Sequence, residues 1–154
     1  MMEEKLLFRL EEFIDAPIEV VFDYVDDDEK IKLWNDYMIE NIYENETKKN
    51  TPGSKFISVQ QFGRKKISVE VELLEFEPPN KIIMVSDSKE GTSYTRYFLT
   101  REYDGTRLVM ESSIIPKNTY YRILTKLFGG LGKYVYEEQI QALKDYVELR
   151  DFED

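Results

Sequence analysis

The chain has 154 residues and carries 31 acidic against 21 basic side chains, which gives a net charge of −10. This length suits one domain spanning residues 1–154, and the negative charge disfavours nucleic acid and anionic lipid surfaces as long-range partners. Histidine and cysteine are both absent. Their absence excludes disulfides, thiol nucleophiles, histidine-based triads and imidazole or thiolate metal sites, so we expect no metal and no cofactor.

The N-terminus gives an expectation about location. It reads Met1-Met2-Glu3-Glu4-Lys5, which lacks the basic region, apolar stretch and cleavage site of a secretory leader. No window approaches the roughly 20 apolar residues that a membrane span needs. We therefore expect a cytoplasmic protein that does not insert into membranes.

The first third of the chain predicts one strand followed by two short helices. The strand covers Leu6–Ile14, and Pro17 suits the first turn of a helix that runs to about Val25. Apolar residues then recur at helical spacing, at Ile18, Val21, Phe22 and Val25. Three aspartates end this helix, and Asp28 is predicted to cap a second helix over Glu29–Trp34.

From residue 37 onward the pattern changes to strands. Residues 66–73 alternate cleanly, with apolar residues at every second position. Further strands are predicted at Met38–Tyr43, Lys55–Phe62, Ile82–Ser88, Ser93–Tyr103 and Arg107–Ile115. Tight turns join them, so we expect an antiparallel sheet of seven strands with one buried face. A strand at its edge, such as Met38–Tyr43, could pair with a second copy, and its Glu and Asn residues also suit edge protection, so monomer and homodimer both remain open.

The last third is predicted to be helical. From Tyr120 an apolar stripe continues through Leu131 and Val135 to Val147, so we expect it to face a partner surface along its whole length. Gly129 and Gly130 interrupt it. They predict either a break, with Tyr120–Phe128 as a separate short helix, or a close approach to the sheet that only glycine permits.

Several segments, in their order along the chain, resemble the START-like superfamily. These are Ile14-Asp15-Ala16-Pro17-Ile18-Glu19-Val20-Val21-Phe22, then Trp34, then Gly105-Thr106-Arg107-Leu108 and finally Leu143-Lys144-Asp145-Tyr146-Val147-Glu148. The closest resemblance is to the polyketide cyclase/dehydrase-like branch, also called SRPBCC. The resemblance implies an α+β, Bet v 1-like helix-grip fold, in which a curved seven-stranded antiparallel sheet wraps around a long C-terminal helix and two short helices follow strand 1.

Members of this superfamily bind hydrophobic molecules between the sheet and the helix. The resemblance therefore implies a carrier or sensor of a small lipid-, polyketide- or isoprenoid-like ligand. Strand alternation and helical spacing select the residues that would line such a cavity. They are Phe56, Ser58, Ile67, Val69, Val71, Met84, Ser86, Tyr97, Leu99, Leu108, Met110, Ser112, Tyr120, Leu124, Leu127, Phe128, Leu131 and Val135. Trp34 either plugs the junction between the small helices and the sheet or stacks on the ligand.

Two other functions stay open. A cyclase or dehydratase would act through polarising groups in the pocket, for which the candidates are Arg96 and Tyr97, with Tyr94, Tyr120 and Tyr134 as further choices. The structural alternative for all of these is an ordinary surface or core position, and we favour a non-enzymatic role. A protein-interaction module, as in the chaperone-activating branch of the superfamily, would instead show an exposed apolar patch and a tightly packed core.

Overall fold

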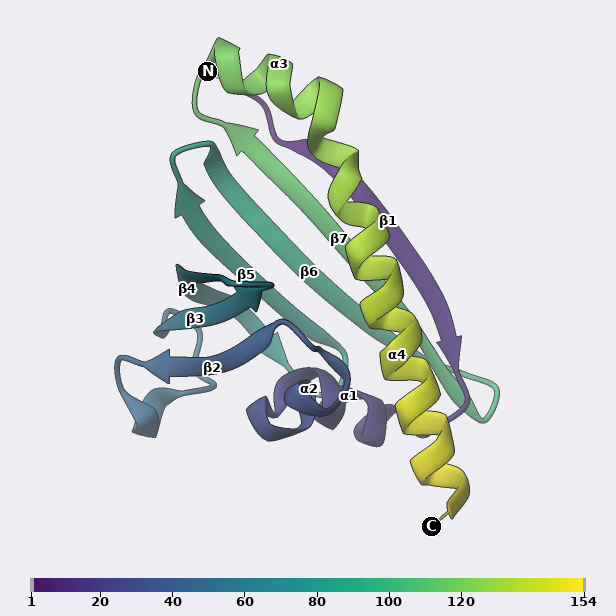
Figure 1. Cartoon of the computed structure of the whole chain (residues 1–154). Helices are drawn as coiled ribbons and strands as arrows, with labels where there is room; N and C mark the ends of the chain where they lie inside the picture. The colour runs from purple at the N-terminus through teal and green to yellow at the C-terminus, as the bar shows by residue number, and fades with distance from the viewer. Residues whose placement is uncertain (1, 154) are drawn as a thin grey trace.

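The computed structural model describes residues 2–153 and shows one strongly bent antiparallel sheet with a long helix across its inner face (Figure 1). The strand order is β1-β7-β6-β5-β4-β3-β2. The strands are β1 (Lys5–Ile14), β2 (Met38–Tyr43), β3 (Lys55–Phe62), β4 (Lys65–Glu77), β5 (Lys81–Ser88), β6 (Gly91–Glu102) and β7 (Gly105–Pro116). The predicted seven-stranded antiparallel sheet is confirmed, with β2 at one edge and β1 at the other.

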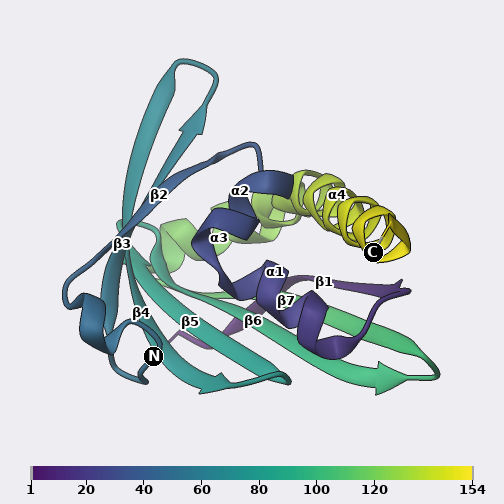
Figure 2. The ribbon, with the colours of Figure 1, turned by 90° about the horizontal axis from the view of Figure 1, so that it is seen from below.

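Two short helices separate the first two strands, and the remaining helices follow the last strand. The former are α1 (Ile18–Asp26) and α2 (Asp28–Trp34). The latter are α3 (Thr119–Phe128) and α4 (Gly132–Glu153), joined by the 3-10 turn η2 (Gly129–Leu131), and a further 3-10 turn, η1 (Glu46–Lys48), follows β2. Seen from below, the sheet curves around α4 while α1 and α2 lie at one end (Figure 2). The helix-grip fold is confirmed.

One cap differs from the prediction. The side chain of Asp27, and not that of Asp28, accepts hydrogen bonds from the backbone N–H groups of Glu29 and Lys30, at 3.0 and 3.1 Å. Helix α2 therefore begins one residue earlier than predicted, at Asp28. With three aspartates in a row, the sequence alone does not say which carboxylate occupies the cap, and the change frees Asp28 for contacts elsewhere.

The C-terminal half of α4 is fixed against β1. Ile140, Leu143 and Val147 repeat at helical spacing and are buried in the core with the apolar side chains of β1 and α1. At the end of β1, Lys144 Nζ donates a hydrogen bond to the carbonyl oxygen of Phe13 and pairs with Glu148, both at 2.6 Å. The tight packing is thus concentrated in this half of α4, while its N-terminal half lies over the cavity described below.

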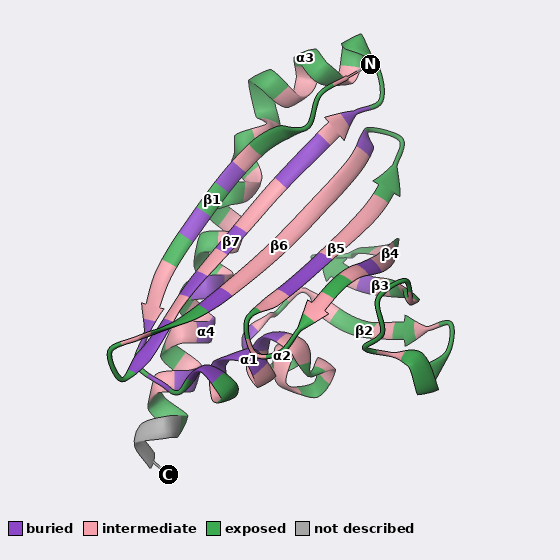
Figure 3. Ribbon diagram, turned by 180° about the vertical axis from the view of Figure 1, so that it is seen from behind, coloured by how far each residue is buried: buried purple, intermediate pink, exposed green. Residues whose placement is uncertain are grey.

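The α3–η2 part of the terminal helical region has the predicted break but not the predicted burial. The break at the glycines is confirmed, because η2 separates α3 from α4. A Cβ atom at Gly129 would lie 2.7 Å from Leu7 Cδ2, so close packing at that glycine also holds. The apolar stripe, however, is not covered along its whole length: Tyr120 and Leu131 are exposed, because α3 extends past the end of the sheet (Figure 3).

Candidate functional site

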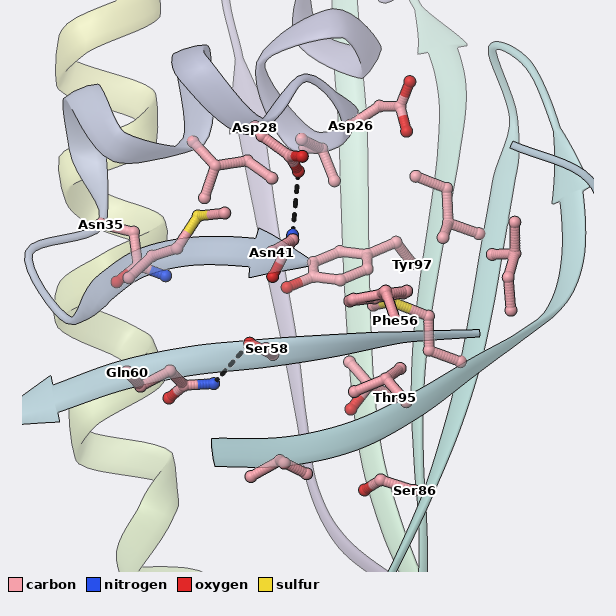
Figure 4. Close-up of a pocket in the computed structure, with 18 of the residues that line it drawn as sticks. Asp26, Asp28, Asn35, Asn41, Phe56, Ser58, Gln60, Ser86, Thr95 and Tyr97 are labelled. Atoms are coloured by element: carbon pink, nitrogen blue, oxygen red, sulfur yellow. Dashed lines mark hydrogen bonds between the residues drawn. The ribbon is translucent and has the colours of Figure 1, made fainter. Parts of the chain in front are cut away.

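A cavity of about 440 Å³ lies between the inner face of the sheet and α4. Its apolar wall comes from the strands and from the two small helices, and Figure 4 shows Phe56 and Tyr97 pointing into it. Strand alternation explains this wall, since residues two apart on one strand share a face. The apolar lining residues include Val25, Ile31, Trp34, Phe56, Val69, Val71, Leu73, Phe76, Ile82 and Met84.

One part of the wall is made of hydroxyl groups. Ser93 and Thr95 lie two residues apart on β6 and share its inner face with Tyr97. Ser86 of β5 is paired directly with Ser93, and Ser112 of β7 directly with Thr95. Among residues 2–153, none of these five hydroxyls has a protein hydrogen-bond partner, and none is sealed away from the cavity space. They are therefore available to water or to polar atoms of a ligand.

The end of the cavity near α2 and β2 is polar and charged. Asp28 accepts a hydrogen bond from Asn41 Nδ2 at 2.8 Å (Figure 4). It accepts another from the Tyr43 hydroxyl at 2.9 Å. Lys49 Nζ lies 3.4 Å from the same carboxylate and 4.8 Å from the centre of the Tyr43 ring. Because Asp28 has a cation and two donors around it, its charge is satisfied within the protein.

A second carboxylate at this end is less well compensated. Within residues 2–153, the Asp26 side chain accepts a single, long hydrogen bond of 3.5 Å, from Asn50 Nδ2. Burial, followed by repulsion from the Asp28 carboxylate, raises the pKa of Asp26 from 3.8 to about 6. The Asp26 carboxyl group therefore titrates close to neutral pH. It is the carboxyl group in the cavity whose charge is most suited to change with pH.

Tyr43 and Tyr97, two of the three phenols that line the cavity, remain protonated. Burial raises the pKa of Tyr97 above its ordinary value, with a smaller contribution from the neighbouring Tyr136. Burial also raises the pKa of Tyr43, and its hydrogen bond to Asp28 adds to the shift. At neutral pH both groups can donate hydrogen bonds but cannot act as bases.

Nine of the nineteen residues predicted to line a ligand cavity do line this one. Together they come from α2 and from five strands, and the fold brings them onto one concave surface. They are Trp34, Phe56, Ser58, Val69, Val71, Met84, Ser86, Tyr97 and Ser112. Trp34 is buried against the small helices, where its Nε1 donates to the carbonyl oxygen of Tyr24 at 2.8 Å, and it also lines the cavity. Its stacking on a ligand stays a prediction.

The structure places the other predicted lining residues elsewhere. Leu99, Leu108 and Met110 face inward but are buried in the solid core beneath the other half of α4, so no cavity surface reaches them. Ile67 lies near the β3–β4 turn, beyond the lining. The remaining residues belong to the α3–η2–α4 region, which extends past the sheet: Tyr120, Leu127, Phe128 and Leu131 are exposed, and Leu124 and Val135 are half-buried outside the lining.

The candidate catalytic pair is split between the two faces of the sheet. Tyr97 faces the cavity, whereas Arg96 faces outward, because adjacent residues of a strand point in opposite directions. Arg96 Nη1 lies 2.8 Å from Glu4 Oε2 and 3.0 Å from Ser113 Oγ, and its guanidinium group lies 4.8 Å from the Tyr94 ring centre. The Arg96 guanidinium lowers the pKa of Glu4. Arg96 is thus a surface ion-pair residue, and Tyr94 shares its outward face.

Sequence reasoning missed several lining residues, and for some of them a signal existed. Ser93, Thr95 and Gln60 follow from the same alternation that selected Tyr97 and Ser58. Asp28 and Tyr43, in contrast, meet only because α2 lies against β2, which no local pattern predicts. Tyr136 and Gln139 of α4 also line the cavity and fall outside the stripe that we followed.

Two further observations concern metal binding and membrane-spanning helices. Among the described residues, no group of three or more aspartate, glutamate, histidine or cysteine side chains could hold a metal ion. No helix within residues 2–153 combines the length and the apolar character that crossing a bilayer requires.

Solved structures with the same fold cover nearly the whole chain. A protein of unknown function from Staphylococcus aureus superposes with a TM-score of 0.75 at 14% identity, covering 97% of this chain and 96% of its own. A protein from Nitrosomonas europaea gives 0.72 at 16% identity, covering 93% and 94%. Ara h 8.0201 gives 0.70 at 13% identity, covering 94% and 98%. At these identities the likeness shows the fold, and it agrees with the START-like resemblance.

The sequence itself gives a family. No curated protein shows a significant match to the chain. The family model described as activator of Hsp90 ATPase homolog 1-like protein matches residues 15–144, which span the region from the end of β1 into α4. The chain therefore belongs to the activator of Hsp90 ATPase homolog 1-like family, within the START-like superfamily that its sequence resembles.

Proposed function

We propose that the protein binds a small amphipathic molecule in the cavity between the sheet and α4, as a carrier or sensor. The observation that carries this proposal is the composition of the cavity: an apolar wall around Phe56 and Val71 on one side and five unpaired hydroxyls on the other. A concave, mostly apolar surface with a few convergent polar groups is the usual form of a small-molecule site.

The volume of the cavity indicates that water or a ligand occupies it. A dry void costs about 24 cal/mol per Å³, so a cavity of about 440 Å³ left empty would cost roughly 10 kcal/mol. This is comparable to the whole net stability of a domain. Water or a ligand must therefore fill the space, and an apolar ligand body gains free energy by displacing water from the apolar wall.

The hydroxyl wall defines the polar part of the ligand. Ser86, Ser93, Thr95 and Ser112 both donate and accept, and the protonated Tyr97 adds a donor. Such a wall suits carbonyl, hydroxyl or ether oxygens spread along one side of a ligand. Lys49, a cation in the lining, is already paired with Asp28 and so favours no anionic group. The favoured ligand is thus neutral, with an apolar body and oxygen atoms along one side.

The only tryptophan makes the test direct, since Trp34 lines the cavity. We expect a solvent-sensitive naphthalene dye without charge, such as 6-propionyl-2-dimethylaminonaphthalene, to bind and to accept excitation energy from Trp34. Val71→Trp would fill the cavity and lower the affinity for the dye by about tenfold or more. Glu70→Trp, on the same strand but on its outer face, is the matched control and should leave the affinity unchanged.

Either of two results would overturn the proposal. If the wild-type protein shows no energy transfer to the dye, or if Val71→Trp and Glu70→Trp bind it equally, the cavity is not a ligand site. Val69→Phe provides a second, smaller obstruction in case Val71→Trp fails to fold. Native mass spectrometry of the protein from its source cell then identifies the physiological ligand by mass.

The alternatives explain less of the cavity. The family description names activators of a chaperone ATPase, and a protein-interaction module of that kind predicts an exposed apolar patch together with a tight core. The cavity of about 440 Å³ contrasts with the tight core. The catalytic pair predicted for an enzyme is not assembled in the cavity, because Arg96 faces away from it and Tyr97 stays protonated. Ligand binding uses both the apolar and the hydroxyl parts of the wall.

A further inference from the structure

Large apolar side chains gather on the surface of one segment. This segment, residues 117–134, comprises α3, η2 and the residues that flank them, and we call it the basic apolar segment. Figure 3 shows that α3 extends past the sheet and is largely exposed. Six large apolar residues here are each 52% to 68% exposed: Tyr120, Ile123, Leu127, Phe128, Leu131 and Tyr134. So many uncovered apolar side chains on one short segment mark an interaction surface.

The same segment is basic although the chain is acidic. Residues 112–136 contain no aspartate or glutamate, whereas the chain as a whole carries a net charge of −10. Four cations lie within this range, at Lys117, Arg122, Lys126 and Lys133. Lys133 is 3.7 Å from Glu137, and no ion pair within the described part of the chain involves the other three. The segment therefore attracts anions locally, although the net charge of the chain is negative.

The segment is held in a defined place. Asn118 caps α3 by accepting a hydrogen bond from the Tyr121 N–H at 3.0 Å, and Gly129 packs closely against Leu7 of β1. Arg122 and Lys126 are four residues apart, so they share one flank of α3, beside the exposed apolar stripe. The structure thus presents an ordered helix with an apolar face and a cationic border.

We propose that the basic apolar segment docks on the surface of an anionic lipid bilayer, independently of whether the cavity is occupied. Exposed apolar and aromatic residues such as Ile123, Leu127 and Phe128 enter the boundary between headgroups and acyl chains, and Arg122 and Lys126 meet lipid phosphates. A helix with basic residues beside an apolar face binds membranes in this way. Apolar and cationic side chains together place α3 toward the lipid.

Charge favours a bilayer over a second copy of the chain. A two-fold contact would pack this patch against its own copy, and residues 112–136 offer Arg122 and Lys126 no acidic partner there. An anionic bilayer instead supplies complementary charge and an apolar interior at the same surface. Docking would also bring the cavity to a surface where apolar ligands dissolve.

Flotation with lipid vesicles tests the proposal. Wild-type protein should float with vesicles of equal phosphatidylcholine and phosphatidylserine, bind much less to pure phosphatidylcholine, and dissociate as salt screens the charges. Leu127→Glu should lower the affinity about tenfold or more, and Arg122→Gln with Lys126→Gln about fivefold per cation. Leu149→Glu, an exposed leucine of α4, and Lys89→Gln are the matched controls and should bind as the wild type does.

Three results would overturn the proposal. Wild-type protein could stay with the aqueous phase at low salt, or the segment variants could bind like their controls. Alternatively, size-exclusion chromatography could show a dimer that Leu127→Glu converts to a monomer, which would identify the face as a contact between copies. The emission spectrum of the buried Trp34 verifies that each variant is folded, and dye binding in the cavity should be unchanged by every substitution in the segment.

Discussion

The protonation of Asp26 gives a prediction that can be followed through pH. Its pKa is raised to about 6 because the carboxylate is partly buried and lies near Asp28. The native state therefore keeps a proton that the unfolded state releases at about pH 4, and stability must fall as the pH rises from about 4 to about 6. Asp26→Asn removes this titration, since the amide resembles the protonated acid and can still bond with Asn50.

The magnitude follows from the change in pKa. A rise from 3.8 to about 6 corresponds to about 3 kcal/mol at full value. Because Asp26 keeps contact with solvent, screening reduces this to about 1–1.5 kcal/mol. We expect Asp26→Asn to match the wild type at about pH 4 and to exceed it by this amount at pH 7 and above.

Urea unfolding followed by Trp34 fluorescence measures the difference across the pH range. Asp36→Asn, an exposed carboxylate between α2 and β2, is the matched control and reports the general effect of removing one negative charge from an acidic chain. If Asp26→Asn gives a difference that does not change with pH beyond that control, or if it destabilises the protein at pH 7, the reasoning about Asp26 is wrong.

Three further predictions concern stability and are checked by the same urea unfolding. Leu143→Ala should lower the free energy of unfolding by about 2–5 kcal/mol, because the Leu143 side chain, on the inner face of α4, is fully buried. Leu149→Ala, at an exposed position of the same helix, should change it by less than about 0.5 kcal/mol. Thr106→Val should cost about 1–3 kcal/mol, since the Thr106 hydroxyl donates to the buried carbonyl oxygen of Ala16 at 2.8 Å, and a neutral result would contradict this assignment. Asp27→Ala should cost about 0.5–2 kcal/mol through the lost cap of α2, and Asp27→Asn should retain most of it; equal losses would show that the cap is not the cause.

The elements of the fold could be predicted because their signals are local. The alternation through Val69 and Val71 predicts a strand whatever the sheet around it. The structure extends that strand to Glu77, with a register shift against β5 between Leu73 and Glu75. Glycines at 129 and 130 predict the break between α3 and α4 because glycine disfavours a helix interior. The order of these elements along the chain then carries the superfamily resemblance.

The candidate site could be predicted only in part. Alternation along β6 separates Tyr97 from Arg96 with certainty once the inner face is known, and it also selects Thr95. The polar end of the cavity has no such signal, because Asp28 meets Tyr43 across 15 positions in the chain through the packing of α2 on β2. The contacts of Asp28 were harder still to predict, because either Asp27 or Asp28 could have capped α2, and the structure assigns the cap to Asp27.

The sequence by itself determined which segments become strands or helices and which face of each is apolar. Only the tertiary structure decided what covers each face. Leu131 and Leu143 belong to one predicted stripe, yet the first is 62% exposed and the second is fully buried. The physical reason is that periodicity depends on neighbours a few residues apart, whereas burial depends on where the sheet ends, and that edge is set by pairings between distant strands.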